Sequence, residues 1–124
     1  MKVFIVGPFA LMHDSRMKIV RIEDVEHPGS DGLLARPLLE GEQSNVRIIR
    51  LAAGHALPPH RHGRSDLMLY VVDGQGAIDS PTGSVSFEAG ALASYGGDEE
   101  LRVSNTGVSE MTMLAFLAPK FATS

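Results

Sequence analysis

The sequence predicts an all-β protein, and three observations lead to this prediction. The apolar runs are short, about four to eight residues each, which is typical of strands. Turn residues separate these runs at intervals of about 8 to 12 residues. No long apolar stripe with a helical period competes with them. We therefore expect a β-sandwich or β-barrel with helix confined to short turns.

The expected strands follow from the positions of the turn residues, taken in order along the chain. The apolar runs lie at 18–22, 33–39 in part, 46–51, 56–62, 67–72, 76–80, 84–88, 91–95, 101–105 and 110–118. The breaks between them fall at Pro28-Gly29, Glu40-Gly41, Asp73-Gly74, Pro81-Thr82-Gly83, Ala89-Gly90, Gly96-Gly97 and Thr106-Gly107. Several of these glycines can supply the positive φ that tight hairpins require.

Composition limits the function classes that need to be considered. A chain of 124 residues with 44% apolar residues is expected to form one domain with one core. The net charge of -4 and the scattered basic residues argue against nucleic-acid binding. Without cysteine, any metal ion must be held by nitrogen and oxygen ligands, and a cytoplasmic location is the default expectation.

The first 16 residues are expected to form an N-terminal extension to a domain that spans residues 17–124. Gly7-Pro8 interrupts their apolar run, only one basic residue precedes it, and no clear signal-peptidase site follows. The run is also too short and too broken to span a membrane. The extension is either an upstream addition or a strand that packs on a neighbouring subunit.

A His-x-His pair, His60 and His62, is the strongest chemical signal in the chain. In a β-strand these two side chains would point to the same face, close enough to chelate one metal ion. Imidazole suits zinc, iron, nickel, copper and manganese. His55 has the opposite strand parity and is expected at the surface or in a loop, while His13 and His27 have no partner pattern.

The spacing around this pair resembles the first motif of the cupins, a superfamily of small jelly-roll β-barrels. The matching positions are Gly54, five residues, His60-x-His62, three residues, Asp66 and the later Gly74. The second cupin motif is partly matched by Phe87-Glu88-Ala89-Gly90, Gly96-Gly97-Asp98 and Asn105. The resemblance implies a jelly-roll barrel of six to ten strands over about residues 18–118, which binds small ligands at its mouth.

The resemblance also implies a set of metal ligands, in which His60 and His62 are joined by Asp66. Aspartate is one methylene shorter than the family's glutamate, and a count back from Gly74 reaches Leu67 instead. If Leu67 belongs to the inward-facing series, Asp66 points away from the barrel interior. Leu101 stands where the family has its fourth ligand, a histidine, and the neighbouring Glu99 or Glu100 could replace it, with Glu100 taken as the additional candidate.

These observations favour a small single-domain cupin that binds a small molecule in its barrel and has a reduced or altered metal site. The family resemblance further implies a homodimer formed through edge strands. An alternative is a metal-dependent enzyme, an oxygenase, isomerase or lyase, that uses zinc, iron, nickel or manganese on a small polar substrate. A third interpretation is a sensor or accessory domain. The missing histidine of the second motif favours binding over catalysis.

Overall fold

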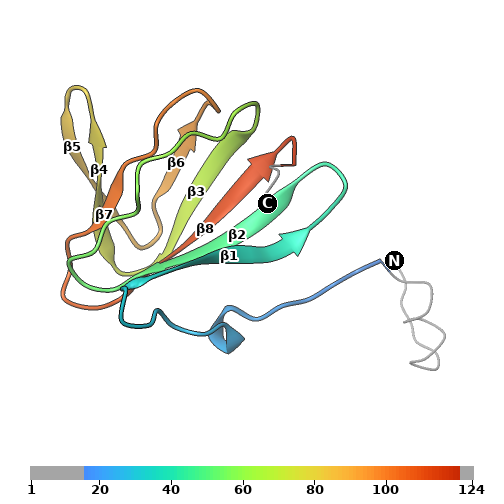
Figure 1. Ribbon diagram of the computed structural model, residues 1–124, viewed down its shortest axis with the longest axis horizontal. Coiled ribbons are helices and arrows are strands. Elements are labelled where there is room, and N and C mark those ends of the chain that lie inside the picture. The colour runs from blue at the N-terminus through green and yellow to red at the C-terminus, as the bar shows by residue number, and fades with distance from the viewer. Residues whose placement is uncertain (1–15, 121–124) are drawn as a thin grey trace.

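The protein is a two-sheet β-structure, seen here in a computed structural model that describes residues 16–120 (Figure 1). Its strands are β1 (Leu33–Glu40), β2 (Asn45–Leu51), β3 (Asp66–Asp73), β4 (Gln75–Ser80), β5 (Gly83–Glu88), β6 (Leu92–Tyr95), β7 (Val103–Asn105) and β8 (Met111–Ala118). One short 3-10 turn, η1 (Ile22–Asp24), precedes them. The prediction of an all-β fold with little helix is confirmed, and eight of the expected strand positions are occupied.

The strands form a five-stranded sheet in the order β1-β2-β8-β3-β6 and a three-stranded sheet in the order β5-β4-β7. In Figure 1 the smaller sheet lies to the left and faces the larger one. The central strand β8 comes from the C-terminal end of the chain, yet it pairs along its length with β2 and with β3. Segments far apart in the sequence therefore build the middle of the large sheet, and all pairs are antiparallel.

The core lies between the two sheets, and strand alternation decides which side chains enter it. Along β3, Leu67, Leu69 and Val71 are completely buried, whereas Asp66 and Met68 are exposed on the other face. Residues from both sheets complete the core, with Ile49, Leu51, Met111, Met113, Ala115 and Leu117 from the large sheet and Phe87 and Val103 from the small one.

Gly74 makes the tight connection between β3 and β4. Its φ is 96°, in the left-handed region that glycine tolerates best. A Cβ atom placed there would lie 2.8 Å from the Cα atom of Met111, so no larger residue fits. The Asp73-Gly74 turn predicted from the sequence is thus required by the backbone conformation and by packing.

The expected strand at 56–62 is wrong. With the other residues between 16 and 120 this segment makes only two isolated bridges, Ala56 with Ser104 and His60 with Leu101. Pro58-Pro59 lies between them, and proline has no amide hydrogen to contribute to a ladder. The two histidines therefore lie on an irregular segment at the mouth of the barrel.

The expected strand at 18–22 is also wrong. No strand of the described part of the chain pairs with it, and it ends in the turn η1, where the amide of Val25 donates a hydrogen bond to the carbonyl of Ile22. This segment lies against the outer face of the large sheet, where Arg50 of β2 donates hydrogen bonds to the carbonyl oxygens of Ile22 and Val25. The segment is attached to the sheet by a side chain instead of a strand ladder.

The expected extension at residues 1–16 lies outside the described residues except for Arg16. Among residues 16–120, no helix is long and apolar enough to cross a membrane.

Candidate functional site

A cavity of about 300 Å³ lies at the mouth of the barrel, against the inner face of the large sheet. Its apolar walls come from the sheet residues Ala35, Ile49, Ala115 and Leu117 and from the covering residues Leu57, Pro58 and Leu101. Three polar side chains also line it, namely Arg47, His60 and His62. A mostly apolar cavity with a few convergent polar groups is the usual form of a small-molecule site.

The two histidines are in direct contact, as the His-x-His spacing predicted. Their ring centroids are 4.5 Å apart and the rings meet edge to face at 63°. His62 is buried, with 5% of its surface exposed, while His60 lies at the exposed rim. The Nδ1 atom of His60 is 2.9 Å from the carbonyl oxygen of Pro58. Because a carbonyl only accepts, Nδ1 is the donor in this hydrogen bond.

The environment of His62 disfavours its charged form. Burial is the main cause, and the nearby His60 and Arg47 add to it, lowering the pKa of His62 from 6.5 to about 4. His62 is therefore neutral at physiological pH. A neutral buried imidazole can accept or donate a hydrogen bond to a ligand without adding charge to the cavity.

Arg47 is a member of the site that sequence reasoning missed. It lies on β2 opposite Ala115 of β8, and both residues line the cavity. Its side chain is partly buried, and within residues 16–120 its guanidinium group has neither a hydrogen bond nor an ion pair. The sequence signal for Arg47 is its position two residues before the core residue Ile49, because residues two apart in a strand point to the same face. That signal can be used only once the register of β2 is known.

Backbone contacts between two loops hold the histidines in place. The amide of His62 donates to the carbonyl of Gly97, and the amide of Leu101 donates to the carbonyl of His60. Gly97 approaches the backbone of Gly63 and Ser65 so closely that a Cβ atom would clash with both. The glycine pair predicted as a turn thus permits the close approach that positions the His-x-His segment.

Leu101 lies beside the two histidines. It is 1% exposed, lines the cavity and forms the bridge with His60. An apolar side chain therefore occupies the position at which the resemblance to the second motif implies a metal-binding histidine. Asn105, the other matched residue of that motif, has a structural role, because its amide nitrogen donates to the carbonyl oxygens of Leu51 and Ser109.

The structure does not bring Asp66 to the histidines. Asp66 begins β3 on the face opposite to Leu67, is exposed, and lines a separate surface hollow with Met68 and Phe116. Since Leu67 is completely buried on the inner face, Asp66 points away from the barrel interior. Of the two orientations of Asp66 that the sequence left open, the structure has the outward one.

The neighbouring glutamates are also directed elsewhere. Glu100 forms ion pairs with Arg102 at 2.9 Å and with Arg61 at 3.8 Å. The Oε1 atom of Glu99 accepts a hydrogen bond from the amide of Gly96. Neither glutamate lines the cavity of Arg47, His60 and His62. Neither Glu99 nor Glu100 has therefore shifted by one residue along the chain to take the place of the missing histidine.

The donor set of this cavity does not fit a divalent metal centre. A catalytic metal is usually held by at least three protein ligands, but the described residues that line the cavity offer two imidazoles and no carboxylate. No group of three or more His, Asp or Glu side chains within residues 16–120 could hold a metal ion. Arg47 adds a permanent positive charge beside His62, which opposes the binding of a cation.

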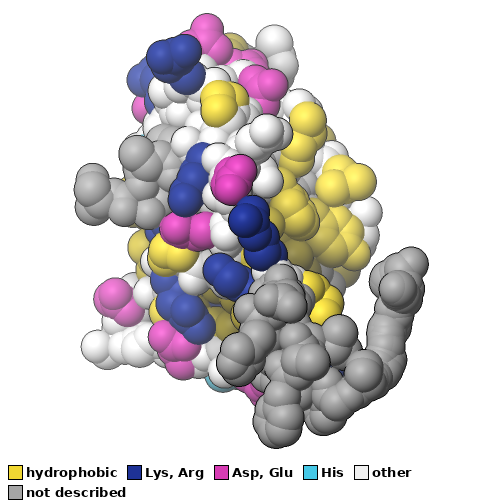
Figure 2. Space-filling model, turned by 90° about the vertical axis from the view of Figure 1, so that its right-hand side faces the viewer, with side chains coloured by type: hydrophobic (Ala, Val, Ile, Leu, Met, Phe, Trp, Pro, Cys, Tyr) yellow, Lys and Arg dark blue, Asp and Glu magenta, His cyan; other side chains and the backbone are white. Residues whose placement is uncertain are grey.

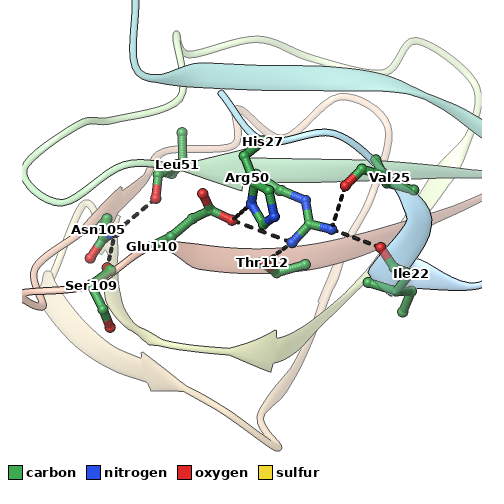
Figure 3. A network of polar contacts seen from close by, with 9 residues as sticks. All are labelled: Ile22, Val25, His27, Arg50, Leu51, Asn105, Ser109, Glu110 and Thr112. Carbon is green, nitrogen blue, oxygen red and sulfur yellow. Dashed lines mark hydrogen bonds and ion pairs between the residues drawn. The ribbon is translucent and has the colours of Figure 1, made fainter. Parts of the chain in front are cut away.

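The other two histidines within residues 16–120 lie outside the cavity. His55 is exposed and its Nδ1 atom is 3.3 Å from the carbonyl oxygen of Ala53, as expected for a loop histidine. His27, to which the sequence assigned no role, contacts Glu110 at 2.8 Å. Glu110 also pairs with Arg50, which joins His27 to the polar network of Figure 3.

Comparison with solved structures shows that this is the cupin fold, the RmlC-like double-stranded β-helix. A double-stranded β-helix protein from Klebsiella pneumoniae has a TM-score of 0.75 at 19% identity, covering 86% of this chain and 91% of its own. An RmlC-like cupin protein from Desulfovibrio desulfuricans has a TM-score of 0.74 at 20% identity, covering 86% and 100%. The protein TT1209 from Thermus thermophilus has a TM-score of 0.74 at 20% identity, covering 84% and 99%.

The jelly-roll fold inferred from the first motif is therefore confirmed, although sequence comparison by itself does not find it. No protein-family model matches the chain, and no curated protein matches its sequence. The chain is therefore a small protein with the cupin fold.

Proposed function

We propose that this protein binds a small molecule in the cavity at the mouth of its barrel and that it does so without a catalytic metal. The observation that carries the proposal is the composition of the cavity. Seven apolar residues surround one guanidinium group and two imidazoles, in a space of about 300 Å³. Such a cavity can bury an apolar group and orient a polar one.

The alternative function, a metal-dependent oxygenase, isomerase or lyase, requires the ligand set His60, His62 and Asp66, with Glu100 as an addition. Asp66 and Glu100 lie outside the cavity, and Leu101 contributes no donor atom. Metal analysis of untagged protein tests this alternative. A stoichiometric zinc, iron, nickel or manganese ion that disappears in a His60→Ala/His62→Ala variant would contradict the proposal.

Ligand binding can be tested with a variant that fills the cavity. Ala35 lines the cavity and is exposed, so Ala35→Phe should block the space without disturbing the core. A library of small fragments is screened against the wild-type protein by protein-observed NMR. We expect hits that shift the amides of His62 and Leu101 and that bind at least about tenfold more weakly to Ala35→Phe.

The neighbouring substitution Leu34→Phe is the matched control, because successive residues of β1 point to opposite faces of the sheet. It should leave fragment binding unchanged. If no fragment binds near His62, or if Ala35→Phe binds every hit as tightly as the wild-type protein does, the proposal fails.

We further propose that the chain forms a homodimer through the outer side of the large sheet. Met68 is 49% exposed, Leu92 71% and Phe116 40%, and all three project from this outer face. Figure 2 shows hydrophobic side chains gathered along one side of the molecule, next to a region of mixed charge. An exposed apolar patch of this kind is common at protein interfaces.

Analytical ultracentrifugation tests the assembly. The wild-type chain should sediment as a dimer, and Phe116→Glu should shift it to a monomer while the circular dichroism spectrum stays unchanged. Val85→Glu is the control, because Val85 is 59% exposed on β5 of the other sheet. A wild-type monomer at micromolar concentration would refute the dimer.

A further inference from the structure

We propose that the ligand of the barrel cavity is a small monocarboxylate, with its carboxylate group held by Arg47 and its compact hydrocarbon body enclosed by the apolar walls. This inference rests on the proposed function and adds the chemical class of the ligand to it.

The first argument is the unmatched charge of Arg47. A guanidinium group stays protonated at every physiological pH and is costly to bury without an anion. Five other arginines have a carboxylate partner within 4.0 Å, namely Arg16, Arg36, Arg50, Arg61 and Arg102. Arg47 is partly buried in the cavity wall and has no such partner within residues 16–120. The missing anion is supplied by the ligand.

The second argument is the absence of competing negative charge. Neither Asp nor Glu is found among the described residues that line the cavity. The two imidazoles carry no negative charge either, and His60 keeps its Nδ1 hydrogen bonded to Pro58. An anion entering this space therefore meets one cation and no repulsive group.

The third argument separates a carboxylate from a phosphate. One planar guanidinium group matches one carboxylate in a bidentate pair, with equal and opposite charge. A phosphate monoester carries close to two negative charges, and the remaining described walls are apolar apart from the two histidines. The second charge would be buried without a partner, which is unfavourable. The charge balance of the cavity thus selects a monoanion.

The fourth argument concerns size. A cavity of about 300 Å³ is at the small end of the range for ligand sites. Ala35 and Ala115 leave space on the sheet side, while Leu57 and Leu117 bound it with branched side chains. This space suits a compact body, such as a single ring or a short branched chain, and it has no row of polar groups for a sugar.

Three related compounds test the inference, namely benzoate, its neutral analogue benzamide, and phenyl phosphate. NMR titration should show that benzoate binds at least about tenfold more tightly than benzamide, because a charged hydrogen-bonded pair is lost in the amide. Phenyl phosphate should bind more weakly than benzoate. Equal affinity of benzoate and benzamide, or tighter binding of phenyl phosphate, would overturn the inference.

Variants at Arg47 locate the effect. Arg47→Gln removes the charge and should weaken benzoate binding at least about tenfold, with little change for benzamide. Arg47→Lys keeps the charge but lacks the planar fork, so its affinity should fall between the two. Arg64→Gln is the matched control, since Arg64 is exposed and lies outside the cavity. An equal loss in Arg64→Gln and Arg47→Gln would mean that only net charge matters.

The outcomes also separate this inference from the proposed function. If neutral fragments bind in the cavity and Ala35→Phe blocks them, while benzoate has no advantage, the binding function stands and the carboxylate assignment falls. If neither benzoate nor any neutral fragment binds near His62, both fail. If Arg47→Gln does not fold, the comparison of benzoate with benzamide on the wild-type protein still decides the question.

Discussion

Two arginines of β2 lie three residues apart, and the fold uses them in different ways. Arg50 is 5% exposed and lies on the outer face of the sheet, and residues of the protein surround its guanidinium group with hydrogen-bond acceptors (Figure 3). It donates to Thr112 and Glu110 and to the carbonyl oxygens of Ile22 and Val25. Arg47 lies on the inner face at the mouth of the cavity, and within residues 16–120 it pairs with no carboxylate.

This difference separates a structural charge from one that is available to a ligand. The Arg50 network joins the segment before β1 to the middle of the large sheet, so its removal should destabilise the fold. The Arg47 site contributes little to the packing of the core, so its removal should change binding more than stability. Position relative to the sheet, and not residue type, determines which role each arginine has.

The largest expected effect comes from substituting the two arginines in parallel. Arg50→Met should lower the free energy of unfolding by about 3–5 kcal/mol, because Glu110 and two carbonyl oxygens lose their buried partner. Arg47→Met should cost less than about 1 kcal/mol. Urea denaturation followed by circular dichroism measures both. Equal losses in the two variants would show that Arg47 is also structural.

Asn105 also has a structural role, although the resemblance placed it in a site motif. Asn105→Ala should lower the free energy of unfolding by about 2–3 kcal/mol, because the carbonyl of Leu51 and the amide of Gly107 lose a hydrogen bond within the fold. The exposed neighbour Thr106→Ala should change it by less than about 0.5 kcal/mol. Unaltered stability in thermal unfolding of Asn105→Ala would argue for a binding role instead.

In the cavity, His62 should make the free energy of unfolding depend on pH. Its pKa is lowered to about 4 in the folded protein, while the unfolded chain takes up a proton near 6.5. Between these values the unfolded state binds more protons, so stability falls as the pH drops, by at most about 1.4 kcal/mol per pH unit. Below about pH 4 this contribution levels off.

Urea denaturation of wild type and His62→Gln at several pH values isolates the effect, since the two proteins share every other titrating group. The variant should have the shallower dependence of stability on pH between 6.5 and 4. Parallel curves for the two proteins would mean that His62 is protonated as readily in the folded state as in the unfolded chain.

The smallest effects are expected where the sequence suggested metal ligands outside the cavity. Asp66→Asn and Glu100→Gln should each change stability by less than about 1 kcal/mol, because Asp66 is exposed and the ion pairs of Glu100 lie at the surface. Isothermal titration calorimetry should show no tight zinc binding by the wild-type protein or by either variant, because the described lining of the cavity offers two imidazoles and no carboxylate. Tight zinc binding by the wild-type protein that is lost in either variant would place that carboxylate at the histidines.

The sequence predicted much of the fold because its main signals are local. Turn residues and alternating apolar side chains placed eight strands, and the contact between His60 and His62 was expected from their spacing. The strand at 56–62 failed where Pro58-Pro59 overrides the apolar pattern. The strand at 18–22 failed because Arg50, distant in sequence, holds the end of that segment against the sheet.

By itself, then, the sequence determined the all-β class, the turns that require glycine and the lack of a histidine at position 101. Only the tertiary structure decided that Asp66 faces outward and that Arg47 completes the cavity. The physical reason is register. A strand's two faces alternate with a period of two, but which face becomes the interior depends on pairing with β8, whose residues come from the other end of the chain.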